Sequence, residues 1–203
     1  MPRKRRRLLG ETVCHHMVQG INKEEIFKTE DNKEKYIELL KKYYKEFKID
    51  IIAYCIMDNH VHMLLYANDI KQISNFMKNI NSIYAMYYNK KTDRVGYVFR
   101  NRFKSVPIMD RKQLYTCIKY IHMNPVKAGK VKEESDYRYS SYNDYLNKTG
   151  FIHEEILKFI FNSSNTSSDV LSECNAIFNR SISSSISAFP GACRTNIRRS
   201  PAG

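Results

Sequence analysis

The sequence of 203 residues contains no run of about 18 apolar residues, so it predicts no membrane-spanning helix. It also lacks the hydrophobic core of a secretory signal peptide near its first residues, which favours a cytoplasmic location. The cysteines are five in number and form no Cys-x-x-Cys pair, so neither a disulfide framework nor a thiolate zinc site is indicated. The chain does have 42% hydrophobic and 12% aromatic residues, which is enough for a folded core.

Acidic residues are scarce in two stretches of the chain. Overall, 34 Lys and Arg residues stand against 21 Asp and Glu residues, which gives a formal net charge of +13. Residues 1–10 hold five basic residues and no acid, and residues 95–132 hold nine basic residues and one acid, so these two stretches account for the whole excess. Clustered basic charge favours a polyanionic partner such as a nucleic acid. A solvated lysine-rich face that only aids solubility is the alternative.

Changes in composition divide the chain into four parts. Residues 1–10 form a basic arm, and residues 11–148 carry periodic hydrophobic patterns that predict one domain. Residues 149–162 are expected to form a short helical extension. Residues 163–203 form a serine-rich tail, with ten serines between positions 163 and 187, and we expect this tail to be weakly ordered. Whether the tail is native sequence is left open.

The hydrophobic spacing within the domain predicts the order β-α-β-β-α-β, followed by a third helix. This order is typical of an α+β, ferredoxin-like sandwich. Two helices should cover one face of the sheet. The other face would be open unless the third helix crosses it, and we expect the chemistry on that face. Pro107 cannot donate a hydrogen bond to a neighbouring strand, so the last strand should lie at a sheet edge. The expected strands are 13–18, 50–56, 60–66 and the end of 96–108, and the expected helices are 33–48, 70–88 and 111–124.

Two histidines, His60 and His62, flank Val61 on one predicted strand. Alternate residues of a strand point to the same face, so both imidazoles should lie on one side of the sheet, about 7 Å apart along the strand. Such a pair could bind one divalent metal ion. His-x-His also occurs by chance, with the rings serving only as hydrogen-bond partners.

The third predicted helix carries Tyr120 and Asn124, which lie on one helix face because they are four positions apart. The amide oxygen of Asn124 suits a hard cation, and the phenol of Tyr120 can act as a covalent nucleophile. Pro125 follows directly, so we expect the helix to end or kink at Asn124. A single tyrosine is weak evidence in a chain with 15 of them, and only its placement beside the histidines makes it informative.

Three ordered segments of this sequence resemble the IS200-like tyrosine transposases, and among these the relatives associated with repetitive extragenic palindromes (REP). The segments are YCIMDNHVHMLL (54–65), GYVFRNRFKSVPI (96–108) and YIHMNPVKAG (120–129). HMVQGINKEEIF (16–27) is also similar to the first strand and following loop of that family. Members of the family are HUH enzymes, named for His-hydrophobic-His, that cut single-stranded DNA with one tyrosine. The resemblance covers roughly residues 12–145.

The resemblance implies a role for each of four side chains. His60 and His62 would bind a divalent metal ion, Mg²⁺ or Mn²⁺, and Asn124 would be a third ligand. Tyr120 would attack the DNA backbone, which gives a 5′-phosphotyrosine and a free 3′-OH that can later be rejoined. The implied partner is single-stranded DNA with hairpin structure, and the resemblance leaves open whether the protein is a monomer or a homodimer. Two alternatives remain, a non-catalytic domesticated protein that binds hairpin DNA and a metallonuclease that uses water in place of Tyr120.

Three basic residues of the last loop and strand, Arg100, Arg102 and Lys104, are expected to contact the DNA backbone. The alternative is that they only protect a solvated sheet edge. Three aromatic residues alternate with them and are equally compatible with stacking on bases and with packing in the core, namely Tyr97, Phe99 and Phe103.

Other residues near these motifs are expected to be structural. His15 and His16 are adjacent on the first strand and point to opposite faces, so one could approach the site, although packing is the simpler interpretation. His122 lies two positions after Tyr120 and should point elsewhere. Cys55 and Cys117 are expected to be buried thiols.

Overall fold

A computed structural model describes residues 12–101 and 103–147. The predicted basic arm, the helical extension, the serine-rich tail and Arg102 lie outside the described residues. Among the helices of the described part, none is both long and apolar enough to span a bilayer.

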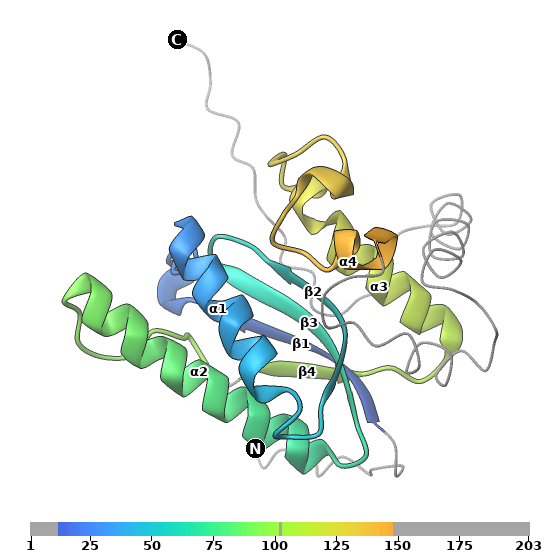
Figure 1. Cartoon of the computed structure of the whole chain (residues 1–203), viewed down its shortest axis with the longest axis horizontal. Coiled ribbons are helices and arrows are strands. Elements are labelled where there is room, and N and C mark those ends of the chain that lie inside the picture. The colour runs from blue at the N-terminus through green and yellow to red at the C-terminus, as the bar shows by residue number, and fades with distance from the viewer. Residues whose placement is uncertain (1–11, 102, 148–203) are drawn as a thin grey trace.

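Four antiparallel strands form one sheet in the order β2-β3-β1-β4, as a ferredoxin-like fold requires. Helices α1 and α2 lie on one side of this sheet, and α3 and α4 lie on the other (Figure 1). The predicted α+β sandwich with an added helix is therefore confirmed. The strands are β1 (Thr12–Gln19), β2 (Asp50–Ile56), β3 (His60–Ala67) and β4 (Lys104–Pro107), and the helices are α1 (Glu30–Tyr43), α2 (Ile70–Thr92), α3 (Arg111–Lys127) and α4 (Tyr142–Asn147). Two short 3₁₀ turns cover Ile21–Lys23 and Glu134–Asp136.

Strands β2 and β3 form a packed interior layer, whereas β4 at the edge of the sheet is partly exposed. Every residue of β3 except His60 is buried, because helices cover both of its faces. On the side of α1 and α2, the aromatic rings of Phe27, Tyr36 and Tyr84 pack against one another with centroids 4.8–5.3 Å apart. β4 pairs only with β1 and so forms a sheet edge, as Pro107 predicts.

The ends of two helices differ from the predicted ones. α1 ends at Tyr43 rather than at residue 48, and Lys48 in the turn that follows has a positive φ of 53°, which a helix cannot contain. α2 continues to Thr92, where Asp93 adopts a left-handed conformation and its N–H bonds to the carbonyl of Asn89. Neither change moves a strand of the sheet.

The chain that follows α3 returns to the outer edge of β2 and pairs with it. The N–H of Ile56 donates to the carbonyl of Tyr139 at 2.9 Å, and the N–H of Ser141 donates to the carbonyl of Tyr54 at 3.0 Å. The hydroxyl of Tyr137 donates to the carbonyl of Ile56 at 2.8 Å in the buried interior. These bonds satisfy the edge of β2 and hold α3 across β2 and β3 of its own chain.

An ionic cluster links the same parts of the fold. Asp58, in the turn between β2 and β3, pairs with Lys33 of α1 at 2.9 Å and with Lys130, which follows α3. Burial alone would raise the pKa of Asp58, but the hydrogen bonds and charges of Lys130 and Lys33 outweigh it and lower that pKa. The turn that begins β3 is thereby tied to both layers of helices.

Candidate functional site

The two histidines of β3 lie on the face that α3 crosses, at one end of the strand. Their ring centroids are 4.9 Å apart, and the rings are nearly perpendicular. Desolvation lowers the pKa of His60 to about 4, although Asp58 opposes this effect. The pKa of His62 is well below its usual value because of burial and the neighbouring His60 and His15. Both rings are therefore neutral at neutral pH, and each offers a lone pair.

Tyr120 reaches the histidines from α3. The apolar stripe of that helix, Leu114, Ile118 and Ile121, is buried, which leaves Tyr120 partly buried beside it. Its ring centroid lies 5.3 Å from that of His62 in an edge-to-face arrangement. The structure thus brings the predicted nucleophile and the His-x-His pair together within one chain.

Asn124 lies one turn after Tyr120 on α3, but the helix does not end there. It continues through Pro125 to Lys127. Of the two predicted alternatives, the end of the helix at Asn124 is therefore wrong. Pro125 has no N–H and cannot bond to the carbonyl of Ile121, and the side-chain nitrogen of Asn124 donates to that carbonyl at 3.3 Å and to that of Tyr120 at 2.7 Å. Because both acceptors are carbonyls, the amide nitrogen faces the helix, and the amide oxygen is left for another ligand.

His15 belongs to the site, although the sequence favoured a packing role. Its Nε2 lies 3.0 Å from Nδ1 of His62, and the two rings stack with centroids 5.1 Å apart. Its centroid is also 5.9 Å from that of Tyr120, and burial lowers the pKa of His15 to about 4. His16 points to the opposite face, where it packs edge-on against Phe103. The sequence showed that one of the pair would face the site, but not which strand would lie beside it.

Lys127 was missed by the sequence interpretation. Its Nζ lies 5.4 Å from the centre of the Tyr120 ring, in a cation–π contact. Burial, and next the charge of Lys119, lower the pKa of Lys127. Lys127 follows Tyr120 by seven residues, about two helical turns, so the two lie on the same helix face. This spacing in the sequence could have predicted that Lys127 lies near Tyr120.

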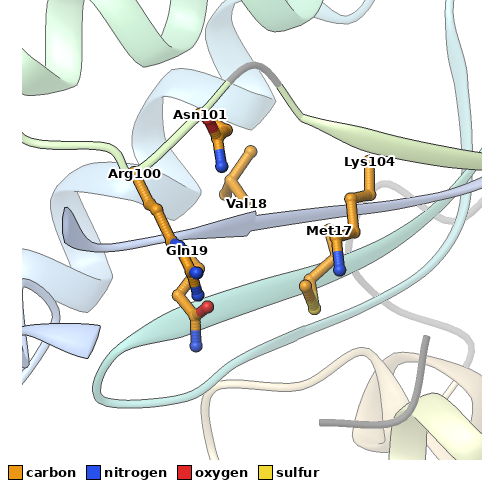
Figure 2. A pocket seen from close by; sticks show the side chains of 6 residues that line it. All are labelled: Met17, Val18, Gln19, Arg100, Asn101 and Lys104. Atoms are coloured by element: carbon orange, nitrogen blue, oxygen red, sulfur yellow. The ribbon is translucent and has the colours of Figure 1, made fainter. Parts of the chain in front are cut away.

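A basic pocket of about 140 Å³ lies beside the histidines, between β1 and the segment before β4. Figure 2 shows Arg100 extending from its loop toward Gln19, and Lys104 lying near Met17. The sheet register places Met17 between His62 on one side and Lys104 on the other, so these side chains share the site's face. The pocket is lined by Met17, Val18, Gln19, Arg100, Asn101 and Lys104, with no acidic side chain among them.

Two of the three predicted DNA-contacting cations, Arg100 and Lys104, therefore line this pocket, whereas Arg102 lies outside the described residues. Gln19 and Asn101 were not singled out from the sequence, because isolated amides carry no motif.

The aromatic residues of the same segment separate into two groups. Phe99 packs near Phe27 and Tyr84, with centroids 6.4 and 6.0 Å away, and Phe103 packs against His16. Tyr97 is 84% exposed. Phe99 and Phe103 thus contribute to the core, and Tyr97 is free to contact a ligand.

The remaining residues named from the sequence are structural. His122 is buried, and its Nε2 lies 2.8 Å from the hydroxyl of Ser141, on the segment that pairs with β2. It points away from the site, as expected, and it holds α3 to that segment. Cys55 and Cys117 are buried, as expected.

The donor atoms of His60, His62 and Asn124 are of types that a divalent ion accepts. His60 and His62 offer neutral nitrogens, and Asn124 offers an oxygen, which is a mixed set for a cation of intermediate hardness. Within residues 12–101 and 103–147, no three His, Cys, Asp or Glu side chains are grouped as a complete metal cage. An ion held by these three residues would keep positions open for water or phosphate oxygens.

Comparison with known proteins agrees with this fold. The sequence model of the family described as "Transposase IS200 like" matches residues 10–124. The chain belongs to this family and is a transposase of the IS200-like class.

Its similarities within the class are to REP-associated tyrosine transposases. A Haemophilus influenzae protein described as a REP-associated tyrosine transposase is 28% identical over 122 residues, which cover 53% of this chain and 69% of that protein. The solved structure of a REP-associated tyrosine transposase bound to a REP hairpin has a TM-score of 0.58 at 18% identity, over 75% of this chain and 91% of that one.

The buried neutral histidines predict that stability falls in mild acid. Burial, and next the charge of Lys119, lower the pKa of His122 to about 3, whereas an unfolded histidine titrates near 6.5. Below about pH 6.5 the unfolded chain therefore binds protons that the folded chain does not, so the free energy of unfolding decreases. His122→Gln should keep a partner for Ser141 and remove one such histidine.

The free energy of unfolding of the original protein should fall by about 1.4 kcal/mol per pH unit more than that of His122→Gln between about pH 6 and pH 4. Urea unfolding followed by circular dichroism measures both slopes. Equal slopes would contradict the assignment of His122 as a buried neutral group.

Proposed function

We propose that this transposase cuts and rejoins single-stranded DNA beside a hairpin, with Tyr120 as nucleophile and a divalent metal ion at His60, His62 and Asn124. The observation that carries the proposal is the approach of a phenol from α3 to two neutral imidazoles of β3, with the Tyr120 and His62 ring centroids 5.3 Å apart. Packing of the core does not require two polar histidines at this position.

When bound, Mg²⁺ or Mn²⁺ would polarise a phosphate oxygen of the DNA and withdraw negative charge from it. The side chains hold the ion in complementary ways. Burial keeps His60 and His62 unprotonated, so their lone pairs are available at neutral pH. The amide of Asn124 is fixed by its bonds to the α3 backbone, so its oxygen needs no further ordering to act as a ligand.

Tyr120 would attack the phosphorus of the scissile phosphate. A bond forms between the phenol oxygen and phosphorus, the bond from phosphorus to the 3′-oxygen breaks, and the departing 3′-oxygen takes up a proton. A tyrosine phenol is mostly protonated at neutral pH, so attack is favoured by a nearby positive charge, which Lys127 supplies. The phosphotyrosine retains the energy of the ester, so another 3′-OH can reverse the step and join strands without ATP.

The pocket beside the histidines suits the DNA backbone next to the reacting phosphate. Arg100 and Lys104 offer positive charge, Gln19 and Asn101 offer amide donors, and none of the described residues that line the pocket is acidic. That a similar solved structure is bound to a REP hairpin supports hairpin DNA as the partner.

Replacement of Tyr120 by Phe tests the central claim. We expect the original protein, incubated with a hairpin-bearing single-stranded oligonucleotide and Mn²⁺, to form a covalent protein–DNA adduct that denaturing gel electrophoresis detects. Tyr120→Phe removes the attacking oxygen, so the adduct should disappear, and a chelator should abolish it in the original protein.

An adduct that persists in Tyr120→Phe would refute the role of Tyr120. Binding without an adduct in any metal would favour a non-catalytic hairpin-binding protein, and a free 5′-phosphate without an adduct would indicate a metallonuclease.

Removal of the charge beside the nucleophile should slow the reaction but leave DNA binding nearly unchanged. We expect Lys127→Met to form the adduct about 10- to 100-fold more slowly, which is less than the about 100- to 1,000-fold loss typical of a donor bonded directly to the developing charge, and Lys127→Arg to recover part of the rate. The exposed Lys132 provides a matched control, and Lys132→Met should react like the original protein. An equal loss in both methionine variants would point to general charge rather than to Lys127.

The basic pocket should govern affinity and its dependence on salt. Arg100→Ala combined with Lys104→Ala should weaken oligonucleotide binding and reduce the slope of log affinity against log salt by about 1.4 units for two single-strand phosphate contacts. Fluorescence anisotropy measures both quantities. Lys42→Ala with Lys45→Ala on the α1 side serves as the control, and an unchanged slope in the pocket variant would exclude these contacts.

A further inference from the structure

The His60 imidazole has a fixed tautomer, which follows from a chain of three groups. The side-chain nitrogen of Asn59 donates to the carbonyl of Lys23 at 3.3 Å, so its oxygen faces the other way, toward Nδ1 of His60 at 2.5 Å. That oxygen can only accept, so Nδ1 of His60 must carry the ring proton. The lone pair of His60 is therefore on Nε2.

His62 is held in a different way, by a second imidazole. Its Nδ1 shares one hydrogen bond with Nε2 of His15, at 3.0 Å, and both rings are buried. Each neutral ring carries a single proton, so two arrangements satisfy this bond. If His15 donates, the proton of His62 sits on Nε2, and that nitrogen cannot bind a metal. If His62 donates, its Nε2 keeps a lone pair and matches His60.

We infer that His15 is a positioning residue that accepts the Nδ1 proton of His62, as Asn59 accepts that of His60, so that both rings present Nε2 to one divalent ion. The inference rests on the metal site of the proposed function. It adds to that function an orienting partner for each ligand, and such partners commonly change metal affinity about 10- to 100-fold when they are removed. His15 must then carry its own proton on Nδ1.

The position of His15 suits this role better than that of a third ligand. Its ring stacks on His62 with only 20° between the planes, and its Nε2 is directed at Nδ1 of His62. In the proposed arrangement Nε2 of His15 accepts the hydrogen bond and Nδ1 carries the proton, so neither nitrogen of His15 is left for a metal ion.

Long-range ¹H–¹⁵N spectra of the histidine rings test the inference without DNA and without metal. In the full-length protein at neutral pH, His60 and His62 should both carry the proton on Nδ1. In His15→Phe, His62 has lost its acceptor and should shift toward the Nε2-protonated form, while His60 stays unchanged. In His15→Gln, the amide oxygen can accept the proton again, so His62 should return to the Nδ1-protonated form.

Calorimetric titration with Mn²⁺ alone gives the second measurement. His15→Phe should bind Mn²⁺ about 10- to 100-fold more weakly than the original protein, and His15→Gln should recover most of the affinity. His16→Gln is the matched control, because its side chain points to the opposite face, and its Mn²⁺ affinity should be unchanged. The Tm of each variant separates a loss of folding from a loss of binding.

Three results would overturn the inference. The first is an Nε2-protonated His62 in the original protein, which needs no variant to fold. The second is an unchanged tautomer and Mn²⁺ affinity in His15→Phe. The third is a direct shift of the His15 ring nitrogens on addition of diamagnetic Zn²⁺, which would make His15 a ligand. If DNA adducts fail to form while the tautomers and Mn²⁺ binding are as expected, the strand-transfer function fails and this inference stands.

Discussion

The site depends on the attachment of α3 to the sheet of its own chain. Backbone bonds that join Tyr139 and Ser141 to the edge of β2 contribute to this attachment, together with the contact between Asp58 and Lys130. Residues that are far apart in sequence thereby meet across one sheet face, and Tyr120 comes to lie against His62. Without these bonds, α3 would depend mainly on its buried apolar stripe for its position.

Burial has two opposite effects at this site. It keeps the imidazoles neutral, so their lone pairs are available, and it also makes the folded state less stable in acid. Two opposing effects also act on the charge of Lys127. Burial lowers the pKa of its ammonium group, whereas the contact with the Tyr120 ring favours the positive charge. A partly desolvated surface therefore gives each charge a larger effect than it would have in water.

Much of the fold and part of the site could be predicted from the sequence because they depend on local periodicity. The alternation around Val61 gave the shared face of His60 and His62, and Pro107 gave the edge strand. His15 was undervalued because its role depends on which strands are neighbours, and no local pattern encodes that pairing. The end of α3 was misjudged because the rule for the residue before proline takes no account of a side chain that replaces the missing donor, as Asn124 does here.

The two edges of the sheet are protected in different ways. The edge of β2 is occupied by residues 139–141 of the same chain, whereas β4 is four residues long and ends at Pro107. A strand from another molecule would find few free backbone donors along β4, because the strand is short and proline has none. The open side of the basic pocket can thus remain accessible without allowing the sheet to grow by self-association.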